Sequence, residues 1–160
     1  MIPKHGRIHP LKQRGRPNAH LTPIQDFITK GIADARESIV LQPQACDVKG
    51  AKRHNPQQCV IAKALHRVYK PQAVAVGRSM AFAVFNGLAV RFRMPPSAQK
   101  LVQEFDQRGR ARNAPIELSP VSPAWRLGNP GRKPAGKKRG EYRQRTRKIG
   151  VRAVGGGITA

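Results

Sequence analysis

Basic side chains are the most abundant reactive groups of this chain, and they are densest near its end. Residues 132–148 hold nine Lys or Arg and one acid. Each Lys or Arg that contacts a phosphate releases condensed counterions, so this run predicts salt-dependent nucleic-acid binding without reading of base sequence. The predicted phosphate-binding residues of the run are Arg132, Lys133, Lys137, Lys138, Arg139, Arg143, Arg145, Arg147 and Lys148.

Four further arginines extend this prediction to other parts of the chain. Arg14 and Arg16 lie in a basic N-terminal stretch that has no acid. Arg91 and Arg93 alternate along an expected strand and therefore share one of its faces. They could continue a phosphate track across a sheet. The alternative is a solvated face whose cations oppose edge-to-edge aggregation.

Two aromatic residues lie beside these cations. Trp125 and Tyr142 could stack on unpaired bases, as aromatic side chains do in proteins that bind single strands. Trp125, however, follows Pro120, Val121 and Pro123. We therefore expect it to cover the edge of the core rather than to contact a base.

Neither acid–base catalysis nor metal binding is indicated. The eight Asp and Glu residues are scattered, so no pair suggests a general acid and base. The spacing of Cys46, His54, Cys59 and His66 matches no paired zinc-ligand motif. We predict a protein that is not an enzyme and holds no metal or cofactor, with both cysteines present as thiols.

The overall charge points to a polyanionic partner. The 160 residues include 31 Lys or Arg and 8 Asp or Glu, a formal net charge of +23. A compact body with this much like charge repels itself, so a neutralising partner explains the charge better than fold stability does. No apolar run is long enough for a spanning helix, and the first residues lack the apolar core of a signal peptide.

Charge and proline content divide the chain into three predicted parts. Residues 1–21 are expected to form an extended basic arm, because they hold three prolines and no acid. Residues 22–125 contain the apolar patterns of a core domain. Residues 126–160 carry eleven Lys or Arg and one acid, so this tail is expected to be disordered when free.

Three helices are expected in the core. The first begins with Thr22-Pro23 and has an apolar face that runs from Ile24 to Ala35. The second begins at Asn55-Pro56, and Pro71 ends it. The third covers residues 97 to about 107, followed by Gly109.

Three antiparallel strands are expected between the second and third helices, at residues 73–76, 80–85 and 88–93. Asn86-Gly87 is a strong hairpin signal, because a type I′ turn requires positive φ at both central positions. Residues 38–41 and 116–118 are candidate edge strands. The predicted fold class is α+β, with about three helices on a three-stranded antiparallel sheet.

Three motifs resemble small proteins encoded by tailed bacteriophages. They are the Cys-x-x-Ala-x-Ala-Leu helix that starts at Cys59, the hairpin, and a helix started by proline that ends in Phe105-Asp106. The resemblance covers residues 46–107 and implies a viral setting, in the host cytoplasm or within a virion, without an assigned activity. Both basic ends lie outside it.

Two functions remain open at this stage. The first is sequence-tolerant, architectural binding of DNA or RNA, in which basic arms neutralise phosphates around an orienting core. The second is a structural virion component, such as a capsid-associated or cement-like protein, whose arms bind acidic neighbouring subunits. Neither function involves a membrane.

Overall fold

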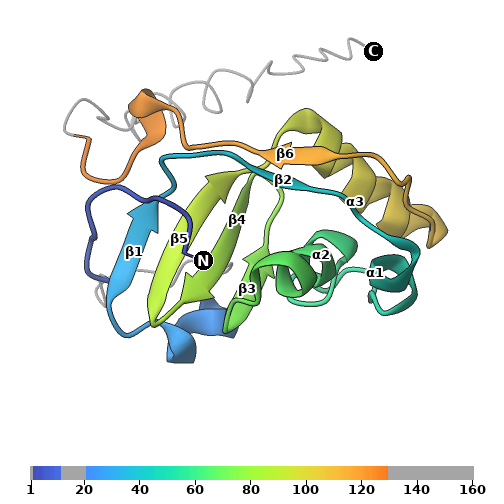
Figure 1. The fold of residues 1–160 in the computed structure, drawn as a ribbon, viewed down its shortest axis with the longest axis horizontal. Coiled ribbons are helices and arrows are strands. Elements are labelled where there is room, and N and C mark those ends of the chain that lie inside the picture. The colour runs from blue at the N-terminus through green and yellow to red at the C-terminus, as the bar shows by residue number, and fades with distance from the viewer. Residues whose placement is uncertain (1, 12–20, 130–160) are drawn as a thin grey trace, which may run out of the picture. The chain divides into compact units, whose positions relative to one another are not determined.

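The computed structural model describes residues 2–11 and 21–129, which form a mixed α and β fold (Figure 1). The strands are β1 (Gly31–Asp34), β2 (Ile39–Leu41), β3 (Ala73–Val76), β4 (Met80–Phe85), β5 (Leu88–Arg93) and β6 (Ile116–Leu118). The helices are α1 (Ala45–Lys49), α2 (Val60–Tyr69) and α3 (Pro96–Arg108), with the short 3₁₀ helices η1 (Thr22–Phe27) and η2 (Pro123–Trp125).

The main sheet has four strands in the order β1-β5-β4-β3 (Figure 1). The three antiparallel strands are confirmed with the expected bounds, and Asn86 and Gly87 have φ values of 50° and 79°, as a type I′ turn requires. The expected three-stranded sheet is incomplete, because β1 joins it parallel to β5. The candidate edge strands are also strands, and they pair with each other as β2 and β6.

The prediction of the first helix is wrong beyond Phe27. Helix η1 ends there, and the chain then extends into β1. The N–H groups of Thr29 and Lys30 both donate to the carbonyl oxygen of Gly87, so the hairpin turn draws this segment into the sheet. Gly31 has a φ of 113°, which disfavours a helix and allows the backbone of His9 to pass very close.

The second helix starts later than predicted, whereas the third is confirmed. Asn55 Oδ1 accepts hydrogen bonds from the N–H groups of Gln57 and Gln58, which makes a turn before α2 begins at Val60. Helix α3 ends at Gly109, whose φ is 68°. Helix α1 was not predicted; its first turn is stabilised by Asp47, whose carboxylate accepts the N–H of Gln44.

Apolar residues cover both faces of the main sheet. On one face, α2, α3 and the β2–β6 pair pack against side chains such as Phe92 and Val90. On the other face, Ile24 and Ile28 of the η1 region pack against Phe82 and Val84. The sheet is therefore buried between two layers, and the polar groups at its β1 edge are held by a fixed frame.

The N-terminal residues are not a separate arm where the structure describes them. His5 pairs with Ala35 and His9 pairs with Ile32, so residues 2–11 line the outer edge of β1. At the other end, residues 126–129 belong to the same compact unit as the core. The core therefore extends past both predicted boundaries. Residues 12–20 and 130–160, which hold the rest of the predicted arms, lie outside the described residues.

Candidate nucleic-acid interface

A buried ion pair connects the two neighbouring strands β1 and β5. Asp34 and Arg91 are register partners, so their side chains lie on the same face of the sheet. Arg91 Nε donates to Asp34 Oδ1 at 2.6 Å, and the two side chains are 13% and 8% exposed. The remaining oxygen, Oδ2, accepts the N–H of Leu127 at 2.7 Å. The pair therefore ties the segment after η2 to the sheet.

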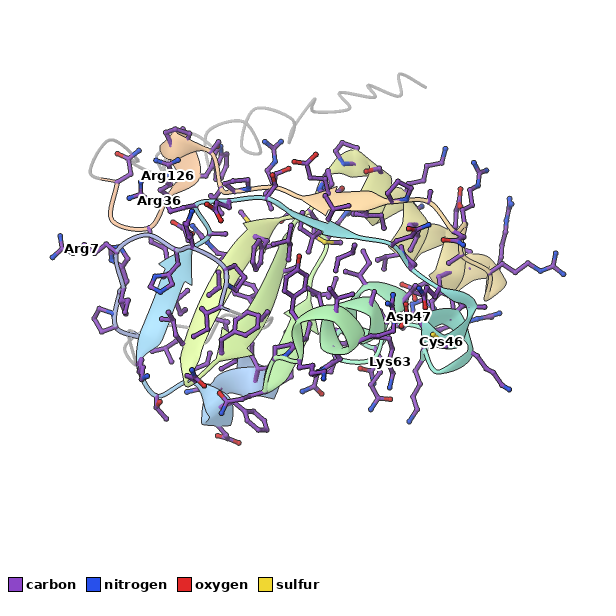
Figure 2. The ribbon with its side chains drawn as sticks, in the orientation of Figure 1. Arg7, Arg36, Cys46, Asp47, Lys63 and Arg126 are labelled. Carbon is purple, nitrogen blue, oxygen red and sulfur yellow. The ribbon has the colours of Figure 1, made fainter. Side chains whose placement is uncertain are left out.

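Asp34 also organises the basic residues around it. Its carbonyl oxygen accepts the N–H of Gly6 at 2.8 Å, which holds the backbone just before Arg7. Its carboxylate holds Leu127, which follows Arg126. Arg36 lies two residues further along the chain, and its guanidinium is close to Gly6. We call Arg7, Arg36 and Arg126 the arginine edge; Figure 2 shows all three at the β1 side of the molecule.

None of these three arginines has an acidic partner within residues 2–11 and 21–129. Five of the seven acids there are in ion pairs with other cations: Asp34 with Arg91, Glu37 with Lys4, Asp47 with Arg67, Glu104 with Arg112 and Asp106 with His54. Arg126 does donate from Nε to the carbonyl oxygen of Val121 at 3.2 Å, a contact that orients the guanidinium without neutralising it. The arginine edge thus keeps its positive charge for an external anion.

Two basic segments lie outside the described residues. Residues 12–20 follow Leu11, and residues 130–160 follow Asn129. These two ends of the described chain are close, because the His9 ring lies against Gly128. Most predicted phosphate-binding residues fall in the undescribed segments: Arg14, Arg16, Arg132, Lys133, Lys137, Lys138, Arg139, Arg143, Arg145, Arg147 and Lys148, and so does Tyr142.

The two predicted phosphate-binding residues of β5, Arg91 and Arg93, have different surroundings in the structure. The Arg91 guanidinium is bound to Asp34 and, through Nη2, to the carbonyl oxygen of Trp125 at 2.9 Å, which favours a structural role over the predicted phosphate contact. Arg93 is exposed and has no ion pair with a described residue, and it remains a candidate for phosphate contact. Spacing along a strand could not distinguish the two, because Asp34 is 57 residues from Arg91 in the sequence.

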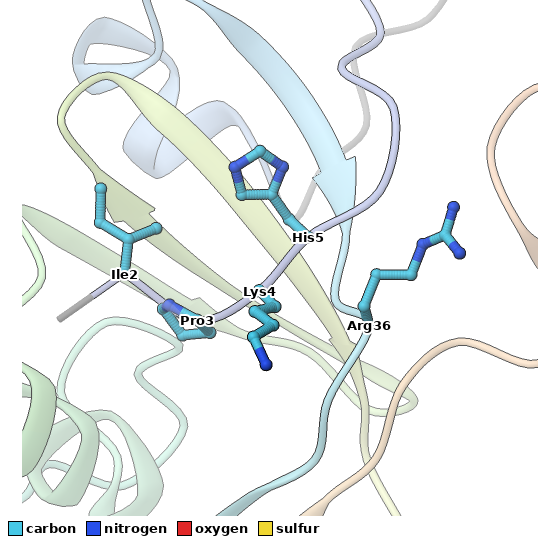
Figure 3. A pocket seen from close by; sticks show the side chains of 5 residues that line it. All are labelled: Ile2, Pro3, Lys4, His5 and Arg36. Atoms are coloured by element: carbon cyan, nitrogen blue, oxygen red, sulfur yellow. The ribbon is translucent and has the colours of Figure 1, made fainter.

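A shallow hollow adjoins the arginine edge. It has a volume of about 520 Å³ and is lined by Ile2, Pro3, Lys4, His5 and Arg36. Figure 3 shows the N-terminal segment with Lys4 and His5 beside Arg36, which follows β1. The hydrogen bond from Lys4 to Glu37 and the charge of Glu37 raise the pKa of Lys4. Because Lys4 is paired with Glu37, Arg36 is the one lining Lys or Arg without a described acidic partner, and the hollow alone indicates no class of ligand.

Four basic residues, Lys49, Lys52, Arg53 and His54, precede α2, and two of them contact helix α3. The Arg53 guanidinium lies against Gly109, at the C-terminal end of α3, where the helix dipole favours a cation. The N–H of His54 donates to Asp106 Oδ1 at 2.8 Å. Lys49 and Lys52 are exposed and have no ion pair with a described residue. Arg53 and His54 therefore join the loop before α2 to helix α3.

The larger groove of about 690 Å³ lies beside α3 and includes His54, Cys59 and Asp106, which together raise the question of a cysteine nucleophile. Burial raises the pKa of Cys59 to about 11, and the charge of Asp106 adds to this effect. At neutral pH Cys59 is a thiol, not the thiolate that nucleophilic catalysis requires. Within the described residues, no three His, Cys, Asp or Glu side chains gather as metal ligands would.

Comparisons of the chain with protein-family models, curated proteins and solved structures find no match. Within residues 2–11 and 21–129, no helix is both long and apolar enough to cross a membrane.

Proposed function

We propose that the protein is a non-enzymatic, sequence-tolerant nucleic-acid-binding protein. The observation that carries the proposal is the arginine edge, where three arginines without described acidic partners lie on segments that Asp34 and its neighbours hold at the β1 side of the sheet. The segments outside the described residues contain thirteen of the 31 Lys and Arg residues. We assign these cations to further phosphates of the same nucleic acid.

The binding is electrostatic in this proposal. Guanidinium groups bind phosphate oxygens in a bidentate manner, and such contacts fix the position of a nucleic acid without identifying its bases. We assign the core an orienting role and the basic segments a neutralising role. The resemblance to small phage proteins supports an architectural role on a viral genome as part of the same proposal.

The test replaces the three residues of the arginine edge by glutamine in the full chain. Binding to labelled duplex DNA, single-stranded DNA and RNA is measured by fluorescence anisotropy over a salt series. Loss of three phosphate contacts should weaken binding to all three and reduce the log-log salt slope by about 2 to 3. The matched control replaces three exposed cations on the helical side, Lys70, Lys100 and Arg108, which have no ion pair with a described residue.

Equal effects of the two triple variants would contradict a localised interface. Polyglutamate, added as a competitor, tests the alternative of a virion component that binds acidic protein surfaces. Polyglutamate and unlabelled nucleic acid of equal total charge are each added to the complex of the protein with labelled DNA. If polyglutamate released the labelled DNA as well as nucleic acid does, an acidic protein partner would replace nucleic acid in the proposal.

A further inference from the structure

The groove beside α3 has a cation near one end and a carboxylate near the other. The N–H of Met94 donates to the carbonyl oxygen of Ser79 at 2.9 Å, so the turn that carries Arg78 lies next to the chain that enters α3. Gln99 Nε2, on the first turns of α3, donates to the carbonyl oxygen of Met94 at 2.9 Å. Asp106 follows two helical turns later, about 10 Å along the axis. Arg78, Gln99 and Asp106 all line the groove, whose volume is about 690 Å³.

Both charged side chains keep the capacity to bind a ligand. Arg78 is exposed and has no ion pair with a residue that the structure describes. Asp106 Oδ1 accepts the N–H of His54 at 2.8 Å, whereas Oδ2 lies 3.7 Å from His54 Nδ1, which is too far for a hydrogen bond. The guanidinium can therefore bind an anion, and Oδ2 can accept a hydrogen bond from a donor on the same ligand.

Apart from Arg78, Asp106 and His54, the residues that line the groove carry no charge at neutral pH. Val76 and Met94 are buried and apolar, and Cys59 is a neutral thiol there because burial raises its pKa to about 11. An apolar lining with a few polar groups, at a volume of several hundred cubic ångströms, is typical of a site for a small organic group.

A nucleotide matches this arrangement of charges. Its phosphate is an anion for Arg78, and the faces of its base are apolar, as are the buried side chains of the groove. The amino group of cytosine, N4, is a donor that carboxylates accept in nucleic-acid complexes. Thymine has the acceptor O4 at the same position, which a carboxylate disfavours. In a duplex the amino group is already paired, so the match requires an unpaired base.

We propose that the groove beside α3 binds one unpaired nucleotide of a nucleic-acid strand, with its phosphate on Arg78 and the amino group of its base donating to Asp106 Oδ2. This inference rests on the proposed function and adds a preference for cytosine over thymine at one nucleotide. The formal charge of +23 favours a strand over a free nucleotide, because the other phosphates of a strand contact further cations of the chain.

The test measures binding of the full chain to labelled oligo(dC) and oligo(dT) of equal length, by fluorescence anisotropy at fixed salt. The natural chain should bind oligo(dC) roughly tenfold more tightly, because one hydrogen bond to a charged group distinguishes the two. Asp106→Asn keeps an oxygen for the N–H of His54 but replaces Oδ2 by an NH₂ group. This group donates to thymine O4, so the preference for oligo(dC) should disappear or reverse.

Two further variants provide the controls. Glu104→Gln makes the same change of charge on α3 outside the groove, and it should leave the preference for oligo(dC) unchanged. A duplex should bind to Asp106→Asn and to Glu104→Gln equally. Arg78→Gln should weaken binding to both oligonucleotides by the same factor, because a phosphate contact does not depend on the base. The urea midpoint of each variant shows whether it folds.

Equal affinity of the natural chain for oligo(dC) and oligo(dT) would overturn the inference, because the groove would then serve another ligand, such as a peptide. A preference that survived Asp106→Asn would also overturn it. The mononucleotide dCMP is the competitor that tests the source of the nucleotide: release of labelled oligo(dC) by dCMP as readily as by unlabelled oligo(dC) would replace the strand by a free nucleotide.

In the first two of these cases salt-dependent binding to oligo(dT) would survive, and so would the proposed function. That function fails on a different result, namely unchanged binding by the triple arginine variant.

Discussion

Asp34 is the residue on which the candidate interface depends most. It neutralises Arg91 inside the fold and anchors both Gly6 and Leu127. Asp34→Asn leaves the Arg91 guanidinium with little solvent and no anion, a change that costs about 3 kcal/mol in a buried pair. We expect urea unfolding at neutral pH to show this loss in the free energy of unfolding.

Asp26→Asn is the control for that measurement, because Asp26 is exposed and makes no ion pair with a described residue. It should change the free energy of unfolding by less than about 0.5 kcal/mol. Similar values for the two variants would mean that the Asp34–Arg91 pair adds nothing to stability.

Asp47 provides a pH-dependent prediction at the opposite end of the fold (Figure 2). Burial acts to raise its pKa, but hydrogen bonds from Arg67 and from the N–H of Gln44, with the charge of Arg67, outweigh burial and lower the pKa below its ordinary value of 3.8. The folded state therefore binds the proton less readily than the unfolded state. The stabilisation is fully present above about pH 4 and is lost as the pH falls through the lower, folded value.

Urea unfolding of Asp47→Asn and of the natural chain at pH 7 and near pH 3 checks this prediction. The variant should be less stable by about 1.5 kcal/mol at pH 7, because hydrogen bonds to a charged group are lost. The difference should shrink at the acidic pH, where the natural carboxylate takes up a proton. A difference that grew on acidification would have the opposite sign and would contradict the lowered pKa.

At the scale of elements, short sequence patterns predicted the elements that depend on contacts between residues near in sequence. The hairpin of β4 and β5 follows from Asn86-Gly87 and alternating apolar residues, and Gly109 ends α3 as expected. The segment after Phe27 was misassigned because Ile24, Ile28 and Ile32 have helical spacing, whereas the deciding contacts are with Gly87 and His9. Such contacts join residues distant in sequence, so no local pattern contains them.

The same reason explains what was missed at the interface. Arg7, Arg36 and Arg126 were not singled out, because only the folded chain brings the segments of Arg7 and Arg126 to Asp34 and Arg36. One sequence signal existed: Asp34 is an acid within an apolar stretch, Ile32 to Ala35. A carboxylate that is buried in a strand is costly unless a cation neutralises it, so Asp34 indicated an ion pair with a nearby Lys or Arg.

The turn of the hairpin gives the prediction at the scale of elements. A Cβ at Gly87 would collide with the Oγ1 atom of Thr29, and the residue has a φ of 79°. Gly87→Ala should therefore lower the free energy of unfolding by about 2 kcal/mol, from strain and from the collision together.

A double-mutant cycle with Thr29→Ala separates the two causes. Thr29→Ala removes the colliding oxygen, so Gly87→Ala should cost less in that background, while the strain of positive φ remains. An equal cost of Gly87→Ala in both backgrounds, measured by urea unfolding, would show that the collision plays no part.

At the scale of the whole molecule, the charge is distributed unevenly along the chain. Residues 130–160 carry ten Lys or Arg and one acid, Glu141, whereas the described acids are mostly bound in ion pairs within the core. The core and the C-terminal segment should therefore contribute differently to binding. The core offers a few oriented guanidinium groups, and the segment offers many cations.

A chain that ends at Asn129 tests this division. The described hydrogen bonds of residues 126–129 are made within the first compact unit, so the shortened chain should keep its urea midpoint. If the removed segment contacts about 8 phosphates, its loss should reduce the log-log salt slope for nucleic-acid binding by about 7. The residual binding should depend on the arginine edge and be lost in the triple variant. An unchanged slope would mean that the segment does not bind phosphate, which leaves the arginine edge as the whole interface.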